Sequence, residues 1–203
     1  MALTTYSELK SAVADWLIRD DLTTQIADFI RLAEARINRE LRVREMVEQA
    51  TGTVSTQALD IPTGFIEVVK LQLDSESSTP LEYRPIEDAE RRVASDTSGV
   101  PLWFSVLGGQ FRFYPSPDGS YDYTLDYYSE VPALSDTATT NWLLTKAPDL
   151  YLFGALAEAS LFLMEQDKYA VWRARFDEVK RSLHGAEARA KRTNGPLRMR
   201  VAS

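Results

Sequence analysis

The residues of this chain that could do chemistry are two carboxylates, one histidine and a few glycines. Asp122 and Asp126 alternate with tyrosines and a leucine, so both acids face one side of a predicted strand. At a rise of about 3.3 Å per residue their Cα atoms lie about 13 Å apart, which is wider than the carboxylate pair of a typical glycosidase. The same alternation predicts a half-buried strand with its rings inward and its acids outward. We favour that interpretation over glycoside hydrolysis by Asp122 and Asp126.

The single histidine and the absence of cysteine leave little for nucleophilic or metal chemistry. His184 stands near Arg181 and Gly185 late in a predicted helix, with no oriented third group beside it, so a surface histidine is the favoured interpretation. A chain without cysteine forms no disulfide and no thiolate zinc site. We therefore predict no catalytic residue, no cofactor and no metal, and a protein that is not an enzyme.

Two glycine-containing segments predict turns and not ligand sites. Gly108-Gly109 is followed by neither the helix nor the Lys-Ser/Thr pair that a phosphate-binding P-loop requires. Asp118-Gly119 lacks the spaced acids of a calcium loop. Because Gly108-Gly109 lies between two apolar and aromatic runs, it supplies the positive φ of a tight hairpin turn.

Aromatic residues are dense in the middle of the chain, and one interpretation is a platform on which sugars or bases stack. The rings belong to Trp103, Phe104, Phe111, Phe113, Tyr114, Tyr121, Tyr123, Tyr127 and Tyr128. Residues 51–140 carry fourteen acidic and five basic side chains, and this net charge of −9 disfavours nucleic acid, whose binding depends on phosphate neutralisation. A core or subunit-interface role is favoured for the rings, and carbohydrate binding through this aromatic β region remains an alternative.

The elements that would position these residues follow from the apolar periodicity. Thr5 and Glu8 have the spacing of a capping box. Helical stripes follow at Leu9, Val13, Trp16 and Leu17, at Ile26, Ile30, Ala33, Ile37 and Leu41, and at Tyr169, Trp172, Phe176, Val179 and Leu183. Small residues dominate 154–160, which favours close helix packing. Between about 45 and 140 the period changes to two, which predicts short strands.

These elements predict an α+β fold, a four-helix bundle made from N- and C-terminal helix pairs with an inserted antiparallel β domain. The predicted domains are residues 1–44 and 141–192 for the bundle and 45–140 for the inserted β domain, followed by an extended C-terminal tail, 193–203. The last fifteen residues carry five basic side chains and no acid. No apolar stretch approaches the roughly 20 residues that a bilayer requires, so we expect no membrane association.

The order of the motifs over about residues 60–165 resembles that of phage head–tail adaptor proteins, similar to the podovirus tail tubular protein A group and related connectors. The motifs are Asp60-Ile61-Pro62, Phe65-Ile66-Glu67, Pro80-Leu81-Glu82-Tyr83, Gly108-Gly109, Tyr114-Pro115, Pro117-Asp118, Tyr127-Tyr128, Leu134-Ser135-Asp136, Asn141-Trp142-Leu143-Leu144 and Pro148 to Leu156. No single motif is specific, and the resemblance rests on their order.

The resemblance implies a structural subunit of the virion neck, assembled in the host cytoplasm into a dodecameric ring. Such a ring joins the portal to the tail and extends the DNA channel, through which DNA passes without sequence-specific binding. Its partners would be the portal protein, a tail nozzle or tail-tube protein, and further copies of itself. Since the C-terminal segment of such connectors often reaches the portal, the tail residues Leu197, Arg198, Met199, Arg200 and Val201 are the expected portal interface. Another neck or tail-completion role is the alternative.

Overall fold

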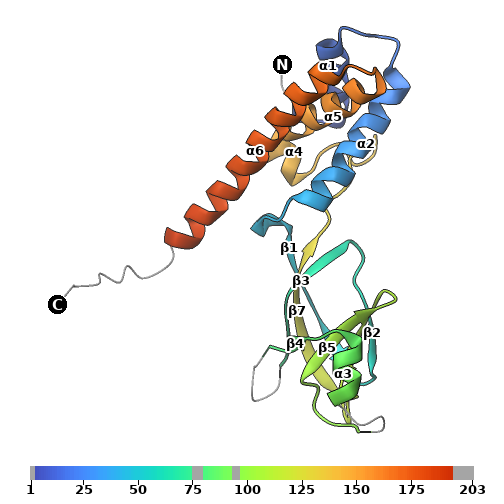
Figure 1. Cartoon of the computed structure of the whole chain (residues 1–203), viewed down its shortest axis with the longest axis vertical. Coiled ribbons are helices and arrows are strands. Elements are labelled where there is room, and N and C mark those ends of the chain that lie inside the picture. Colours follow the sequence, from blue (N-terminus) through green and yellow to red (C-terminus); the bar gives the residue numbers. More distant parts are fainter. Residues whose placement is uncertain (1–2, 75–79, 93–96, 194–203) are drawn as a thin grey trace, which may run out of the picture. The chain divides into compact units, whose positions relative to one another are not determined.

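The computed structural model describes residues 3–74, 80–92 and 97–193, with 187–193 described by their backbone alone. The chain divides into two compact units (Figure 1). The helical unit comprises Met1–Arg44 and Val131–Ser203, and the β unit comprises Glu45–Glu130. Each unit has its own buried core, and each is described by itself below.

Five α-helices form the described part of the helical unit. They are α1 (Tyr6–Leu17), α2 (Thr23–Glu40), α4 (Trp142–Lys146), α5 (Pro148–Phe162) and α6 (Gln166–Thr193). The predicted capping box begins α1, since the Glu8 backbone donates to the Thr5 hydroxyl at 3.3 Å and the Thr5 backbone donates to the Glu8 carboxylate at 3.0 Å. Leu9 and Val13 of the predicted stripe are buried, whereas Trp16 is half exposed.

Helix α5 is the element around which the helical unit packs. It contacts α1, α2, α4 and α6, and it is buried on nearly every side. Gly154 permits the close approach, because a Cβ at this position would lie 2.9 Å from the Cβ of Ala33 on α2 and 3.4 Å from the ring of Phe176 on α6. None of the described helices, α5 included, is both long and apolar enough to cross a bilayer.

The segment between residues 131 and 141 is held against the helical unit by buried side chains. Leu134 donates its backbone N–H to Glu34 at 2.7 Å, and Asn141 donates to the Tyr151 hydroxyl at 2.8 Å. Burial raises the pKa of Glu34 against the opposing effect of that backbone hydrogen bond. Asn141 also accepts the N–H of Leu144 at 2.8 Å, so this one side chain caps α4 and fixes the segment that enters it.

The β unit contains two sheets whose inner faces share one core. The first has the order β1 (Val47–Val54), β7 (Tyr121–Ser129), β3 (Phe65–Leu73), with antiparallel pairing throughout. The second has the order β2 (Ala58–Asp60), β6 (Gln110–Tyr114), β5 (Trp103–Leu107), β4 (Glu82–Tyr83). A short 3-10 helix, Arg44–Met46, precedes β1. The hairpin predicted at Gly108-Gly109 is confirmed, since the two glycines turn β5 into β6 with φ of 60° and 77°.

The predicted four-helix bundle with an inserted antiparallel β domain is wrong, although the class is α+β. The described residues form six α-helices and not four. Ala147 separates α4 from α5, and α3 (Ile86–Arg92) lies inside the β unit. Ion pairs from Asp88 to Arg84 (2.9 Å) and Arg92 (3.3 Å) stabilise α3. The second sheet is mixed, since the connection that contains α3 returns the chain so that β4 and β5 pair in parallel.

Candidate functional site

The two carboxylates singled out from the sequence bind different neighbours along β7. Thr53 donates its hydroxyl to Asp122, and Gln49 donates its side-chain amide to Asp126, each at 2.8 Å. Leu125, between them in the sequence, is fully buried on the opposite face of the sheet. Asp126 also pairs with Lys70 of β3 at 3.7 Å, so each acid binds neighbours on the adjacent strands, in the alternation expected of a half-buried strand.

More than half of the aromatic residues singled out from the sequence lie in the core of the β unit. Five of the nine rings singled out from the sequence are buried, namely Phe104, Phe111, Phe113, Tyr114 and Tyr127, and the other four are half-buried. Phe111 packs edge-on against Phe65 and Phe104, with ring centroids 5.5 and 5.9 Å apart. A carbohydrate-binding site made of these rings therefore finds no support in the described structure.

The remaining predicted positions contribute no site in the described part of the chain. His184 is half-buried on α6. Among the described residues, no cluster of three or more His, Asp or Glu side chains could hold a metal ion. The expected portal interface, Leu197 to Val201, lies outside the described residues.

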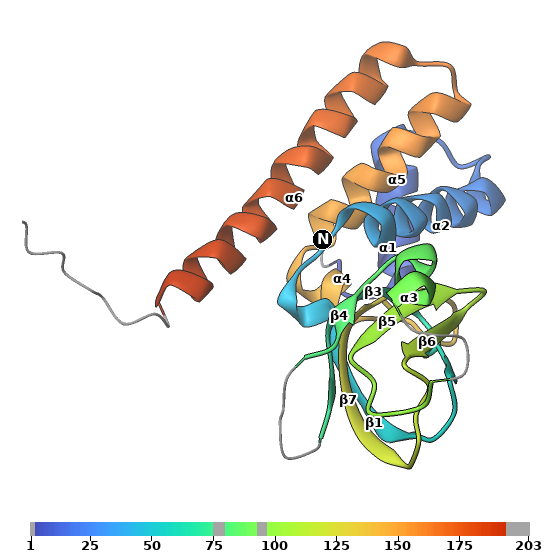
Figure 2. The same ribbon diagram turned by 60° about the horizontal axis from the view of Figure 1, so that its bottom comes forward.

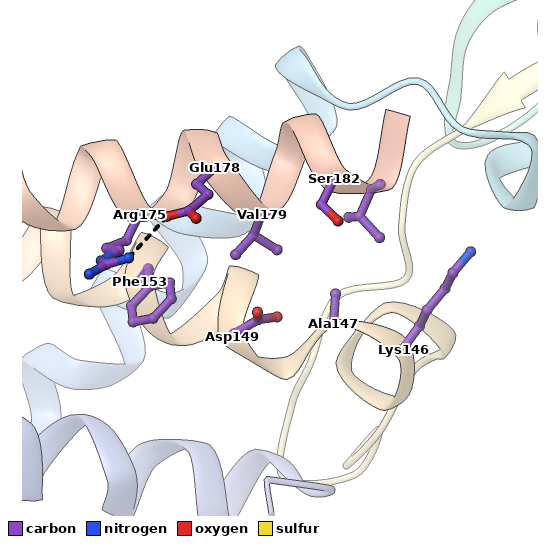
Figure 3. Close-up of a pocket in the computed structure, with 9 residues that line it drawn as sticks. Lys146, Ala147, Asp149, Phe153, Arg175, Glu178, Val179 and Ser182 are labelled. Carbon is purple, nitrogen blue, oxygen red and sulfur yellow. Dashed lines mark hydrogen bonds and ion pairs between the residues drawn. The ribbon is translucent and has the colours of Figure 1, made fainter. Parts of the chain in front are cut away.

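A groove between helices of the helical unit is a candidate contact surface, here called the α5–α6 groove (Figure 3). It has a volume of about 450 Å³ and is lined by Lys146, Ala147, Asp149, Phe153, Arg175, Glu178, Val179, Ser182 and Leu183. Phe153 of α5 and Val179 of α6 face it, and Arg175 and Glu178 form an ion pair of 3.1 Å at its margin. An apolar floor with a balanced polar margin suits a protein side chain better than a charged ligand.

A cluster of three aromatic rings continues from the groove across the same unit. Trp16 on α1 packs against Phe153 on α5 and Trp172 on α6, with ring centroids 6.2 and 5.5 Å apart, and Phe153 stacks on Trp172 at 6.0 Å. Phe153 belongs both to this cluster and to the floor of the groove. Trp16 remains 50% exposed, so the cluster joins three helices and still presents a large ring to solvent.

Charged side chains fix α6 against α2 along the stretch that forms the groove wall. Arg173 donates to Glu40 at 3.0 Å, and Lys180 donates to the same carboxylate and lies 3.0 Å from Asp177. Desolvation raises the pKa of Glu40, but the hydrogen bonds from Lys180 and Arg173 outweigh it and hold that pKa below its ordinary value. The cluster sets the register of α6 and with it the shape of the groove.

Large apolar side chains are exposed at one end of the helical unit. Ile18, directly after α1, is 90% exposed, and Met164, directly after α5, is 89% exposed. Figure 1 shows the end of α1 and the turn from α5 to α6 at this same end. Sequence reasoning missed both residues, because it interpreted Asp20-Asp21 as the break after the first helix and no glycine marks either helix end.

The β unit has an apolar groove of its own, between the edge strands β3 and β4. It has a volume of about 890 Å³, and its lining includes Phe65, Val69, Leu81, Tyr83 and Val106. The sheets meet at one end of it, where Leu81 donates its backbone N–H to Leu71 at 2.7 Å. Both units thus present apolar surface of the kind that protein partners cover.

Comparison with known proteins identifies a family for nearly the whole chain. A family model described as SU10 adaptor protein matches residues 4–200, a span that includes both units. No curated protein matches the sequence.

Proposed function

Because the chain belongs to the SU10 adaptor protein family, which makes it a phage adaptor and a structural component of the virion, we propose that it is the head–tail adaptor that joins the portal to the tail. The observation that carries the proposal is the extent of the family match, which runs through the helical unit, the β unit and most of the C-terminal tail. The surfaces of the described chain support it, since they are apolar grooves and exposed apolar side chains suited to protein partners.

The proposed adaptor works as a ring of identical copies, with twelve the number that the resemblance implies. Neighbouring copies in a ring meet through heterologous contacts, one face of a copy against a different face of the next. The helical unit carries candidate faces of both kinds, a groove between α5 and α6 and exposed side chains after α1 and α5.

The charge of the chain suits a channel through which DNA passes without being held. The whole chain has a formal net charge of −7, and the β unit alone carries fifteen acidic and five basic side chains. A ring of such copies presents an acidic field to DNA, and phosphate groups gain nothing from approaching it. The proposed role of the ring is therefore to guide DNA and not to bind its sequence.

The proposed contact with the portal is the tail, through Leu197, Arg198, Met199, Arg200 and Val201. Residues 189–203 carry five basic side chains and no acid, so the tail differs in charge from the rest of the chain. Its apolar residues alternate with arginines, which provides both apolar burial and pairing with acidic groups on a partner.

Truncation after Arg192 tests the portal contact. The shortened chain should keep its circular dichroism spectrum and its thermal midpoint, and it should no longer co-elute with the portal protein in size-exclusion chromatography. The full-length double variant Arg198→Glu/Arg200→Glu is the matched control for charge, and it should bind the portal more weakly while keeping the apolar residues. Undiminished portal binding by the truncated chain would refute this interface.

A further inference from the structure

The groove of the β unit lies where its two sheets are joined at one end only. β3 is the last strand of the first sheet and β4 the last strand of the second, and Figures 1 and 2 show both on the same side of the unit. The strands meet where Gln72 forms an isolated bridge with Pro80. Nearer Phe65, no described strand pairs with the outer edge of β3. We call this space the β3–β4 groove, which is lined by residues 65–71, Pro80, Leu81, Tyr83, Phe104 and Val106.

Large apolar side chains from three strands are exposed in this groove. Val69 on β3 is 49% exposed, Tyr83 on β4 is 58% exposed, and Val106 on β5 is 41% exposed. These strands belong to both sheets, yet the three side chains line a single recess of about 890 Å³. Covering apolar surface of this kind is favourable, because it removes the surface from water.

The wall of the groove suits an extended segment. Seven consecutive residues of β3, 65–71, form this wall, which is about 20 Å long at a rise of about 3.3 Å per residue. The outer edge of a strand presents backbone N–H and C=O groups with which an added extended segment pairs. Successive side chains of such a segment point to opposite faces, so every second side chain enters the groove.

Irregular pairing in β3 favours a short occupant over a second copy of the same edge. The register of β3 against β7 shifts between Phe65 and Glu67 and again between Val68 and Lys70. Bulges of this kind bend a strand and disturb a long ladder between two edges. A short segment that is held mainly by its apolar side chains needs no such ladder.

The sequence of the tail has the pattern that this groove requires. Leu197, Met199 and Val201 alternate with Arg198 and Arg200. An extended backbone would therefore place three apolar side chains on one face and two guanidinium groups on the other. The three apolar positions span about 13 Å, which fits within the length of the β3 wall.

Charge favours the same match. The β unit carries fifteen acidic and five basic side chains, whereas residues 189–203 carry five basic side chains and no acid. The lining contains one acid, Glu67, and one base, Lys70, and the carboxylate of Asp126 lies 3.7 Å from Lys70 and counters its charge. Glu82, between two lining residues in the sequence, keeps 61% of its side chain exposed. The arginines of the tail thus meet a unit with an excess of carboxylates.

We propose that Leu197, Met199 and Val201 of one copy lie in the β3–β4 groove of another copy until a portal is bound. Arg198 and Arg200 then face the acidic surface of the receiving copy. The contact is heterologous, since each copy provides a tail and receives one. The inference goes beyond the adaptor role, because the portal contact proposed above uses the same five residues and the two contacts exclude each other. A copy without a portal thus covers both its apolar tail and its apolar groove.

Cross-linking between full-length copies tests the contact, and it is specific because the chain contains no cysteine. A Met199→Cys chain is mixed with a Val106→Cys chain that is lengthened by a tag, and the mixture is oxidised mildly. A disulfide requires Cα atoms within about 7 Å, so only a tail that lies in the groove brings the two sulfurs together. We expect a several-fold higher yield of the mixed-mass dimer than from two control pairs. One replaces Met199→Cys by Arg198→Cys, on the other face of the tail, and one replaces Val106→Cys by Leu102→Cys, exposed outside the groove.

A double lysine variant separates docking from folding. Val69→Lys/Val106→Lys places two cations at exposed positions of the groove, so the circular dichroism spectrum should stay unchanged. Self-association measured by sedimentation equilibrium should fall by at least about tenfold, the effect of losing apolar contacts at the centre of an interface. The matched control is Val100→Lys/Leu102→Lys, which adds the same charge at two exposed apolar positions of the β unit outside the groove and should associate as the unchanged chain does.

The outcomes distinguish this contact from the adaptor role. A mixed dimer no more abundant than in the control pairs, or unchanged association of Val69→Lys/Val106→Lys, would overturn the groove contact and leave the adaptor proposal standing. Mixed dimers without any portal binding would support the contact and count against the proposed partner. Saturating portal protein should lower the yield, and an undiminished yield with the portal bound would overturn the mutual exclusion. A single copy with both Met199→Cys and Val106→Cys that closes a disulfide within itself at high dilution would overturn the contact between copies.

Discussion

The helical unit and the β unit of this chain differ in where they place their large apolar side chains. The β unit encloses its rings, with Phe111 and Phe113 fully buried between two sheets, and its polar surface is strongly acidic. The helical unit buries α5 almost completely but leaves Ile18 and Met164 exposed beyond its helix ends. The two units thus have separate cores, and the β unit also exposes large apolar side chains, among them Val69 and Leu102.

The largest loss of stability is expected from Phe111→Ala, which tests whether the β unit has a core of its own. Phe111 is fully buried and packs against Phe65 and Phe104, so the cavity left behind should lower the free energy of unfolding of the β unit by about 4 kcal/mol. The fluorescence of Trp103, the tryptophan of the β unit, measures this loss during denaturant unfolding once the other tryptophans are replaced by phenylalanine.

Phe111→Leu is the matched control, and it should cost less than half as much because it leaves a smaller cavity. A second background, in which Trp103 is replaced by phenylalanine and Trp16, Trp142 and Trp172 are kept, reports on the helical unit. An equal loss of stability in that background would show that the two units do not have separate cores.

The next largest effect is expected from Gly154→Val in the helical unit. A Cβ at this position meets the Cβ of Ala33 at 2.9 Å, so a valine must push α2 from α5 at a cost of about 3 kcal/mol. Gly185→Ala is the control on α6, where nothing lies within 4 Å of the added Cβ, and it should stabilise by about 0.5–1 kcal/mol through helix propensity. Thermal denaturation followed at 222 nm should show the two opposite shifts, and shifts of the same sign would contradict close packing at α5.

A smaller effect on the free energy of unfolding, which depends on pH, is expected from the Glu40 carboxylate that joins α2 to α6. The folded-state pKa of Glu40 is lowered by Lys180 and Arg173 against the opposing desolvation, so its stabilisation is fully present above the ordinary value of 4.5 and is lost as pH falls through the folded pKa. Glu40→Gln should lose about 1 kcal/mol at pH 7 and less at lower pH. Urea titrations between pH 3 and pH 7 measure this, and a constant difference between variant and parent would contradict the role given to Glu40.

The smallest expected effect is a gain in stability. Ile18 is in the left-handed conformation, with φ of 55°. Ile18→Gly should stabilise the free subunit by about 0.5–1 kcal/mol, because relief of the left-handed strain (about 1–2 kcal/mol) exceeds the entropy that glycine costs. Differential scanning calorimetry measures the change, with Ile18→Ala, which keeps the strain, as the control. A loss of stability in Ile18→Gly would show that the exposed side chain serves the subunit itself.

Features of the fold that depend on neighbouring residues were predictable from the sequence. The capping box at Thr5 and Glu8 and the hairpin at Gly108-Gly109 both follow from residue types a few positions apart, and both are confirmed. The parallel pairing of β4 with β5 was not predictable, because it depends on how a 19-residue connection returns to the sheet. The four-helix bundle was wrong in part because the sequence did not show that Ala147 separates a short helix, α4, from α5.

The candidate site was less predictable than the fold. Val179 and Leu183 were predicted as apolar stripe residues of the last helix, but the sequence does not show that they line a groove beside α5. Ile18 and Met164 were missed because the residue in the left-handed conformation at a helix end is usually glycine, and neither helix has glycine at that position. A hydrophobic residue that follows the last turn of a helix where glycine is expected is the pattern that could have found them.

The most direct test of the adaptor proposal is an electron micrograph of the purified chain incubated with the portal protein of its phage. The account predicts a closed ring of copies stacked on the tail-facing side of the portal, with a central channel. Portals that remain bare, or copies that bind singly without closing into a ring, would contradict it.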